Sequence, residues 1–384
     1  MAHILIAYKQ FPAPDVGHAG GQSVYRLLDA LHRRGHRLTL VARIRDEERV
    51  HLDTLRPLCD QIYTVPHHRS LPGPRPLALL RSYVALRRMT RRALEESQPD
   101  VLHVEFAQTA VALFGMRYPL TSFRAHDVNW FMMTQQAKQH DGTAKAKSRL
   151  LERFFRKAEP RLYRTFDVIA AISEGDRRLL APACAPQPVH VLPLSPNLKP
   201  RPNLEPAVAA GPNVLFVGAM WREYNIQAVQ WFLDNVWPGV RETVPEATFY
   251  IVGSKPTPEI QAHHDGEHVI VTGFVDDLAS WYASAAVFVS PMLVAGGLLQ
   301  KVVDAMGMGV PVVATSASNH GLSATPGEHL RIADDPRAFA DDVVSLLQDR
   351  EERAKLATAG QNYIQTHYDP EVTVAQWEAT LFDL

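Results

Sequence analysis

Short apolar runs alternate with longer helical patterns along the first half of the chain, and this alternation restricts the fold more than any other feature. The run "HILIAY" at 3–8 precedes a glycine-containing loop and a helical pattern over 21–34 that ends at Gly35. Further strands are expected at 36–42, 61–66, 100–106, 120–125, 167–173 and 189–192, with long helices at 76–97 and 145–165. Strands that alternate with helices predict a parallel sheet with helices on both faces.

A second series of strands begins after a proline-rich segment. Residues 193–212 have few periodic apolar positions and predict an interdomain linker. Strands are then expected at 213–218, 247–253, 268–273, 286–291 and 311–315, and helices at 335–348, 350–366 and 370–383. A chain of 384 residues is longer than a single hydrophobic core usually supports. The sequence therefore predicts an α/β chain with two doubly wound, Rossmann-like domains, 1–192 and 213–369, facing each other across a cleft.

The composition is that of a globular protein, with 46% hydrophobic and 21% charged residues. Cys59 and Cys184 show neither metal-ligand spacing nor a disulfide framework. No apolar run approaches the roughly 20 residues that a transmembrane helix needs, and the opening residues lack a signal-peptide pattern. These features predict a soluble cytoplasmic protein.

The net charge of −1 conceals a division between the two halves. Residues 1–190 carry 29 Lys and Arg against 18 Asp and Glu, whereas residues 191–384 carry 11 against 23. This division indicates that the basic half contacts an anionic partner. Basic and apolar side chains share the stretches 81–94 and 145–164, which predicts peripheral contact with an anionic membrane surface. A solvated helix face, or an arginine cluster for an anionic soluble acceptor, is the alternative, and no nucleic-acid partner is expected.

Two loops in the first half follow predicted strands. The loop "GHAGG" contains Gly17, His18, Gly20 and Gly21, and exposed amides at the start of the next helix favour an anion there. It does not fit the dinucleotide fingerprint, and a tight turn is the alternative. The second loop places His126 and Asp127 at the carboxyl end of strand 120–125, where a histidine has either a catalytic or a structural role.

Two loops in the second half carry positive charge. "GAMWREYN" begins at Gly218 and places Arg222 where it can pair with a phosphate, although an exposed arginine near a helix start is equally ordinary. "GGLLQKVVDAMG" begins at Gly296 and predicts a helix over 298–308. Gly297, Leu298, Lys301 and Asp304 complete this candidate site. The helix amides and Lys301 suit a phosphate, and Asp304 suits a ribose diol; a surface Lys–Asp pair is the alternative.

These motifs, taken in order, resemble the retaining GT-B glycosyltransferases of the group that includes glycogen synthase-like and sucrose synthase-like enzymes. The resemblance extends from "LLDALHRRGHRLTLVA" and "PDVLHVE" through "VLFVGAM" and "VTGFVDDLASWYASAAVFVSP" to "KVVDAMGMGVPVVAT". It is nearest to bacterial sugar transferases with a "KVLEAMAMG" motif. It implies a nucleotide-diphosphate sugar, UDP- or GDP-linked, on the second domain, a glycan or lipid-linked acceptor on the first, and no metal or other cofactor.

The resemblance also implies roles for particular residues. His126 corresponds to a histidine beside the sugar, and Asp304 to a ribose-binding glutamate. The diphosphate would lie at the helix after Gly296 and Gly297, and the C-terminal helix at about 370–384 would pack back on the first domain.

Three positions depart from the family pattern. Gly296 replaces a glutamate that contacts the donor sugar, and Ala219 and Tyr224 replace a basic pair, for which Arg222 and Lys301 are the expected substitutes. The departures keep two alternatives open: a non-catalytic glycosyltransferase-like binding subunit, and a sugar-nucleotide epimerase on the same fold. The sequence leaves the base, the sugar, the acceptor, the linkage and the oligomeric state open.

Overall fold

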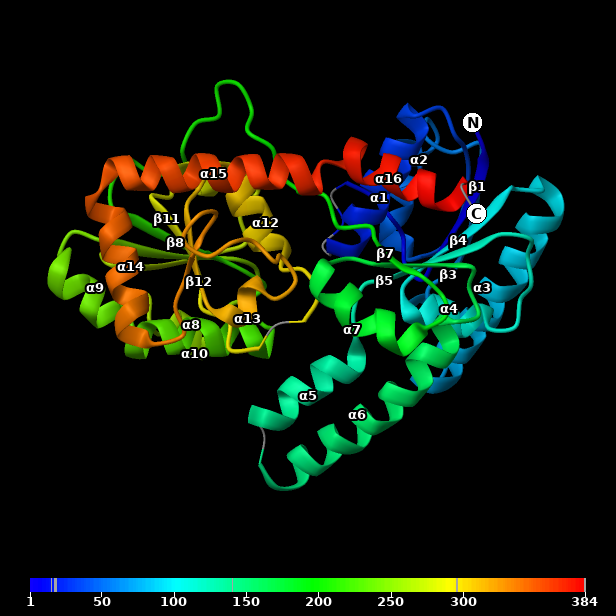
Figure 1. The fold of residues 1–384 in the computed structure, drawn as a ribbon, viewed down its shortest axis with the longest axis horizontal. Coiled ribbons are helices and arrows are strands. Elements are labelled where there is room, and N and C mark those ends of the chain that lie inside the picture. Colours follow the sequence, from blue (N-terminus) through cyan, green and yellow to red (C-terminus); the bar gives the residue numbers. More distant parts are fainter. Residues whose placement is uncertain (15, 17–18, 140, 295, 383–384) are drawn as a thin grey trace. The chain divides into compact units, whose positions relative to one another are not determined.

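The computed structural model describes residues 1–14, 16, 19–139, 141–294 and 296–382. The chain divides into two compact units, each with its own parallel sheet (Figure 1). Unit 1 comprises Met1–Ser195 and Pro370–Leu384, and unit 2 comprises Pro196–Asp369. The boundary falls in the proline-rich segment.

The unit 1 sheet has the order β3-β2-β1-β4-β5-β6-β7, with all neighbours parallel. Its strands are β1 (His3–Tyr8), β2 (Arg37–Ile44), β3 (Gln61–Pro66), β4 (Val101–Glu105), β5 (Thr121–Ala125), β6 (Val168–Ala171) and β7 (Val189–Val191). Most of these strands are buried on both faces, which explains why they read as continuous apolar runs.

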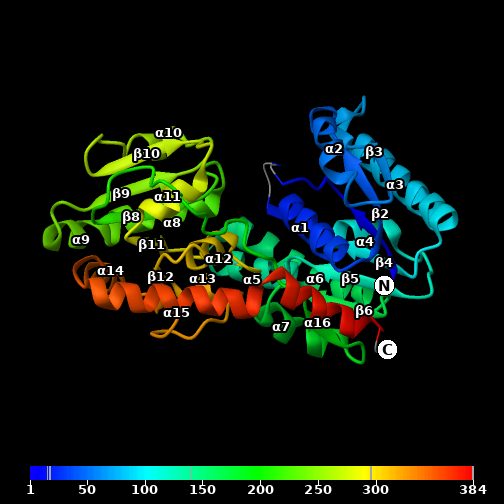
Figure 2. The ribbon, with the colours of Figure 1, turned by 90° about the horizontal axis from the view of Figure 1, so that it is seen from above.

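Helices cover both faces of the unit 1 sheet. The described helices are α1 (Ala19–Arg33), α2 (Leu52–Leu55), α3 (Arg75–Ser97), α4 (Ala107–Leu113), α5 (Asn129–Gln139), α6 (Gly142–Tyr163), α7 (Glu174–Cys184) and α16 (Pro370–Phe382), with 3₁₀ turns η1 (Asp46–His51) and η2 (His68–Ser70). One apolar cluster joins α1, α2 and α16 to the sheet, and a second joins α3, α4, α6 and α7 to its other face. Helix α3 packs over β2 and β3 (Figure 2).

The C-terminal helix α16 belongs to unit 1. Its Glu378 accepts hydrogen bonds from Nη2 of Arg34 at 2.6 Å and Nε2 of His36 at 2.8 Å. Val374, Trp377 and Leu381 place the apolar side of the helix in the unit 1 core. The helix is therefore an integral layer of this unit.

The unit 2 sheet has the order β10-β9-β8-β11-β12-β13, and its neighbours are also parallel. Its strands are β8 (Asn213–Val217), β9 (Thr248–Val252), β10 (Val269–Gly273), β11 (Val287–Ser290), β12 (Val312–Ala314) and β13 (Arg331–Ile332). The sequence predicted the first five; β13 was missed because its two half-buried residues carry no strand pattern.

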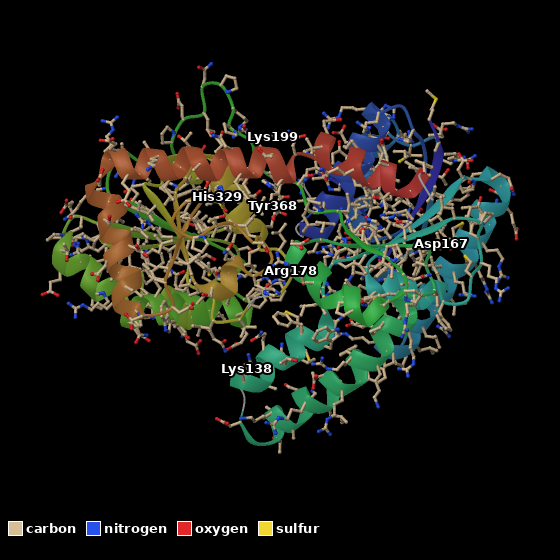
Figure 3. The ribbon with its side chains drawn as sticks, in the orientation of Figure 1. Lys138, Asp167, Arg178, Lys199, His329 and Tyr368 are labelled. Carbon is tan, nitrogen blue, oxygen red and sulfur yellow. The ribbon has the colours of Figure 1, made fainter. Side chains whose placement is uncertain are left out.

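Several of the described helices of unit 2 begin at a capping side chain. The described helices of this unit are α8 (Glu223–Asn235), α9 (Trp237–Thr243), α10 (Pro258–Gln261), α11 (Leu278–Ser284), α12 (Gln300–Gly307), α13 (Ser316–Asn319), α14 (Pro336–Gln348) and α15 (Arg350–Tyr368). The carboxylates of Asp335 and Asp349 cap α14 and α15. At the far end of α15, the Tyr368 hydroxyl (Figure 3) donates to the carbonyl oxygen of Leu322 at 3.0 Å.

Both sheets reverse their strand order at equivalent places, between β1 and β4 in unit 1 and between β8 and β11 in unit 2. In open α/β sheets, ligands bind beyond the carboxyl ends of the strands at this reversal. A ligand site is therefore expected in the loops after the strands at these two switch points.

Candidate functional site

A lysine on α12 lies at the switch point of unit 2. The Nζ of Lys301 donates to Oδ1 of Asn225 at 2.7 Å and lies 3.6 Å from Sδ of Met292, which follows β11. It also lies 4.1 Å from the ring centre of Phe216 on β8. All three partners are neutral, so no carboxylate of the described residues pairs with this ammonium group. Burial, together with the nearby Arg222 guanidinium, lowers the pKa of Lys301 to about 7.

Arg222 supplies a second positive charge near Lys301. It is the exposed N-cap residue of α8, and its Nη1 donates to the Tyr224 hydroxyl at 2.7 Å. Its guanidinium carbon lies 5.0 Å from the ring centre of Trp221. Tyr224, which departs from the family pattern, therefore orients the arginine. The effect of Arg222 on the pKa of Lys301 shows that the two positive charges lie near each other, and their shared role at a phosphate stays a prediction.

Gly218 makes room for the residue that holds Lys301. A Cβ at Gly218 would lie 2.8 Å from Nδ2 of Asn225, and this nitrogen donates to the carbonyl oxygen of Ala219 at 3.0 Å. The carbonyl of Gly218 also approaches Gly253 so closely that a Cβ there would clash with it. The loop after β8 is thus tightly packed against Asn225 and Gly253.

The glycine pair lies farther from the helix than predicted. Helix α12 begins at Gln300 rather than at 298, because Leu299 has extended dihedral angles (φ −78°, ψ 98°). Gly297 adopts φ +65°, and a Cβ on Gly321 would lie 1.9 Å from its carbonyl oxygen. Gly296 and the buried Leu298 flank this close approach. Leu299 provides no capping side chain and the first turn has no acidic residue, so the helix start still favours an anion.

Asp304 and Lys301 have separate partners. The Asp304 carboxylate is 3% exposed, and its Oδ1 accepts from the backbone N–H of Asn197 at 2.6 Å and from Nε2 of Gln300 at 3.1 Å. Its Oδ2 accepts from Nδ2 of Asn197 at 3.1 Å. These bonds fix the start of unit 2 against α12, and the assignment of Asp304 to a ribose stays a prediction.

A buried polar cluster lies at the carboxyl ends of β4 and β5 in unit 1. The parallel register pairs His103 with Ser122 and Glu105 with Arg124. Residues two apart share a face, so His103 and Glu105 point to the side covered by α1 and α16. Oε1 of Glu105 accepts from Nε2 of His103 at 3.0 Å and pairs with Nη2 of Arg124 at 2.9 Å. Oε2 accepts from Nε2 of His126 at 2.6 Å and Nε of Arg124 at 3.2 Å.

The proton positions in this cluster follow from its charges. Burial alone raises the pKa of Glu105, but Arg124 and the two histidine N–H groups outweigh it and hold this pKa well below its usual range. An ionised carboxylate only accepts, so both histidines donate Nε2–H to it. Burial lowers the pKa of His103 and of His126 despite the pull of Glu105. His126 is therefore neutral near pH 7 and presents Nδ1 as a hydrogen-bond acceptor.

Phe106 holds the other side of His126. The two rings stack with centres 3.5 Å apart and planes 9° from parallel, and Phe106 has φ +71°. A Cβ at Gly20 would lie 2.7 Å from Cζ of Phe106, so Gly20 provides the space that this stack occupies. Lys9 Nζ lies 4.2 Å from the Phe106 ring centre.

The other predicted residues of unit 1 that the structure describes lie at the start of α1 and directly after β5. Helix α1 begins at Ala19, so Gly20 and Gly21 lie within its first turn and not before it, which corrects the predicted start at 21. Asp127 is exposed directly after His126 and raises the pKa of Lys9, although burial dominates and lowers it to about 8. Gly17 and His18 lie outside the described residues.

Sequence reasoning missed Glu105, Arg124, Phe106 and Asn225. Glu105 was read as part of an apolar strand, and only the sheet register shows that it meets Arg124. A glutamate inside the run "VLHVEF" was the available signal, because a buried carboxylate requires a partner.

Neither of two large cavities contains these residues. One of about 670 Å³ lies at the amino ends of the unit 2 strands, near Pro212, Ala286 and Arg353. The other, of about 680 Å³, lies along β3 and α3. Within the described ranges, no group of three or more His, Cys, Asp or Glu side chains has a geometry for a metal ion. Over the same residues, every helix is too short or too polar to cross a membrane.

Two family models match the chain. Residues 20–196 match Glycosyltransferase Family 4, and residues 211–349 match glycosyl transferases group 1. The first match covers most of unit 1 and ends at the first residue of unit 2, and the second lies within unit 2.

Two curated proteins are similar to parts of the chain. One is an uncharacterized 44.6 kDa protein of the cps region of Klebsiella pneumoniae, 30% identical over 165 residues, covering 41% of this chain and 42% of that protein. The other is the phosphatidyl-myo-inositol mannosyltransferase of Mycobacterium leprae, 31% identical over 186 residues, covering 47% of this chain and 49% of that protein. The chain spans about half the length of these curated relatives.

Solved structures share the fold along the whole chain. Sucrose-phosphate synthase from Thermosynechococcus elongatus superposes with a TM-score of 0.75 at 17% identity, covering 100% of both chains. HepE of Anabaena, in complex with UDP and glucose, superposes with a TM-score of 0.67 at 15% identity, again over 100% of both chains. The protein therefore has the GT-B fold, and each of its two units is similar to a glycosyltransferase family model.

Proposed function

We propose that this protein is a retaining glycosyltransferase of the glycogen synthase-like and sucrose synthase-like group. It transfers a sugar from a UDP- or GDP-sugar to a hydroxyl of a glycan or lipid-linked glycan in bacterial polysaccharide or glycoconjugate synthesis. Unit 2 binds the donor and unit 1 the acceptor. Both family matches support this proposal, as do the complexes of the structural neighbour HepE with UDP and with UDP-glucose.

The observation that carries the proposal is the environment of Lys301. The ammonium group of Lys301 is half-buried among an amide oxygen, a thioether and an aromatic ring. Its desolvation costs free energy that a bound anion would offset. Arg222 adds charge of the same sign, and the switch point is where such folds bind ligands. A diphosphate is the anion that fits two adjacent cations and an uncapped helix start.

The proposed reaction uses these charges in the transition state. The bond between the anomeric carbon and the diphosphate oxygen breaks while the acceptor oxygen bonds on the same face, and the acceptor proton passes to the leaving diphosphate. Lys301, Arg222 and the α12 amides stabilise the negative charge that develops on this group. The neutral His126 offers Nδ1 to a sugar hydroxyl and holds the sugar in place.

A mass-spectrometric screen of sugar nucleotides tests the activity. Incubation with candidate acceptors is expected to yield a glycosylated product and free nucleoside diphosphate. Free sugar formed without acceptor would instead indicate the epimerase chemistry. Binding of a nucleotide with no turnover of any donor would indicate the non-catalytic subunit that Gly296, Ala219 and Tyr224 leave open.

We also propose that unit 1 contacts an anionic membrane surface at the cytoplasmic face of the cell membrane. Along β3 and α3, Arg81, Arg88 and Arg92 line a groove together with Leu80, Val84 and Met89. On α6, Leu150 and Phe154 are 69% and 61% exposed beside basic residues. Apolar side chains flanked by arginines suit the interface of a bilayer, which would present a lipid-linked acceptor.

A further inference from the structure

The buried cluster of unit 1 extends beyond the histidine that faces substrate in the proposed reaction. His103 is fully buried, and both of its ring nitrogens are engaged: Nε2 donates to Glu105, and Nδ1 lies 3.1 Å from the Ser122 hydroxyl. Because Nε2 carries the proton, Ser122 donates to Nδ1. His103 therefore has one tautomer and one orientation.

The C-terminal helix closes this arrangement. The indole of Trp377 on α16 meets the His103 ring edge-on, with centres 4.7 Å apart and planes 69° from parallel. Trp377 is 1% exposed, and its indole N–H finds no hydrogen-bond acceptor in the described part of the chain. Its position is thus set by packing against the histidine and the surrounding core.

We infer that His103 is a positioning residue for His126 and acts through the carboxylate of Glu105, which both histidines share. The contact of Trp377 with the His103 ring includes α16 in this arrangement. Oε1 of Glu105 is held by His103 and Arg124, which leaves Oε2 directed at His126. Phe106 then fixes the plane of the His126 ring by stacking on one of its faces. The orientation of one nitrogen, Nδ1 of His126, thereby depends on side chains from β4, β5 and α16. These are His103, Glu105, Ser122 and Trp377.

The charges around His126 determine what loss of His103 does. Glu105 and Asp127 favour the protonated form of His126, whereas Arg124 opposes it. A further positive charge, Lys9, lies over the Phe106 ring. Without the His103 N–H, the negative charge on Glu105 is less neutralised and pulls harder on a proton at His126. The pKa of His126 then rises, and neutral His126 is lost at a higher pH.

The test is the titration of His126 by ¹⁵N-detected NMR in the full chain. We expect His103→Leu to raise the His126 pKa by about half to one pH unit, the size expected for one lost hydrogen bond. His103→Gln retains an N–H donor toward Glu105 and is expected to restore the wild-type value. Ser122→Ala is a milder change and is expected to raise the His126 pKa by a smaller amount. Thr90→Ala, which removes a buried hydroxyl from α3, is the control and is expected to leave the His126 pKa unchanged.

A purely structural role for His103 gives a different pattern. The melting temperature would then fall in His103→Leu while the His126 titration stays at the wild-type value, and this result overturns the inference. If His103→Leu does not fold, Ser122→Ala decides: an unchanged His126 titration contradicts the inference.

A kinetic experiment adds to the test and rests on the proposed transferase activity. In His103→Leu, the acid limb of the pH–rate profile is expected to move to higher pH together with the His126 pKa. An inactive protein would contradict the proposed function without affecting the NMR result.

Discussion

The Nζ of Lys301 and the Oδ1 of Asn225 lie 2.7 Å apart, and their hydrogen bond joins the helix after β11 to the helix after β8. These two strands flank the switch point of the unit 2 sheet. A neutral amide thus orients the ammonium group without neutralising it, which leaves its charge for a ligand.

Removal of either cation is expected to reduce turnover more than donor binding. In Lys301→Ala and Arg222→Ala, kcat should fall roughly ten- to a hundredfold, because the charge-assisted contact strengthens as the diphosphate departs. Arg337→Ala, which removes an exposed arginine from α14 of the same unit, is the control. Rates within twofold of wild type for both site variants would refute the phosphate role.

The affinity for a nucleoside diphosphate is expected to fall as the pH rises above 7. The folded-state pKa of Lys301 is about 7, so at higher pH the free protein must take up a proton before it pairs with the anion. The dissociation constant should rise by up to about tenfold per pH unit until the pKa of the bound state is reached. Titration calorimetry in two buffers with different ionisation enthalpies measures both the affinity and the proton uptake.

Lys301→Arg is the matched variant for this pH dependence. Arginine stays charged throughout the range, so its complex should form without proton uptake. An affinity of the wild-type protein that is equal at pH 7 and pH 9 would contradict the role of Lys301.

Gly20→Ala is expected to disturb His126 from a distance. The added methyl group would lie 2.7 Å from Cζ of Phe106, so the ring must move away from the histidine that it stacks on. We expect a lower kcat and a changed His126 resonance with the fold retained. Gly35→Ala, at the end of α1, is a control for stability alone, since its φ of +83° strains alanine without touching the cluster. Wild-type kinetics in Gly20→Ala would show that the stack is dispensable.

Particular residues show what the sequence can and cannot predict. Strand positions followed from apolar runs bounded by turns, so β1 and β3 have the predicted bounds, His3–Tyr8 and Gln61–Pro66. The start of α12 was wrong by two residues because Leu298 and Leu299 continue its apolar pattern without helical dihedral angles. Asn225 lies 76 residues from Lys301 in sequence, and Arg124 and His126 lie 19 and 21 residues from Glu105. Such contacts depend on sheet order and register, which spacing alone does not specify.

Association of unit 1 with bilayers should depend on charge. Co-sedimentation at low salt is expected with phosphatidylcholine vesicles that contain phosphatidylglycerol, and to decline as salt is raised. Each basic residue near an anionic surface contributes about 1 kcal/mol, so Arg88→Gln with Arg92→Gln should weaken binding at least tenfold. Arg337→Gln is the control. Equal sedimentation with and without the anionic lipid would remove the membrane proposal.

Calorimetric titration with UDP, GDP and ADP, for the wild-type protein and for Lys301→Met, tests the central claim that a nucleoside diphosphate neutralises Lys301. At pH 7 we expect at least one nucleotide to bind the wild-type protein below millimolar concentration, and Lys301→Met to bind it about tenfold or more weakly. No binding of any of the three at millimolar concentration, or equal affinity in the two proteins, would contradict the claim.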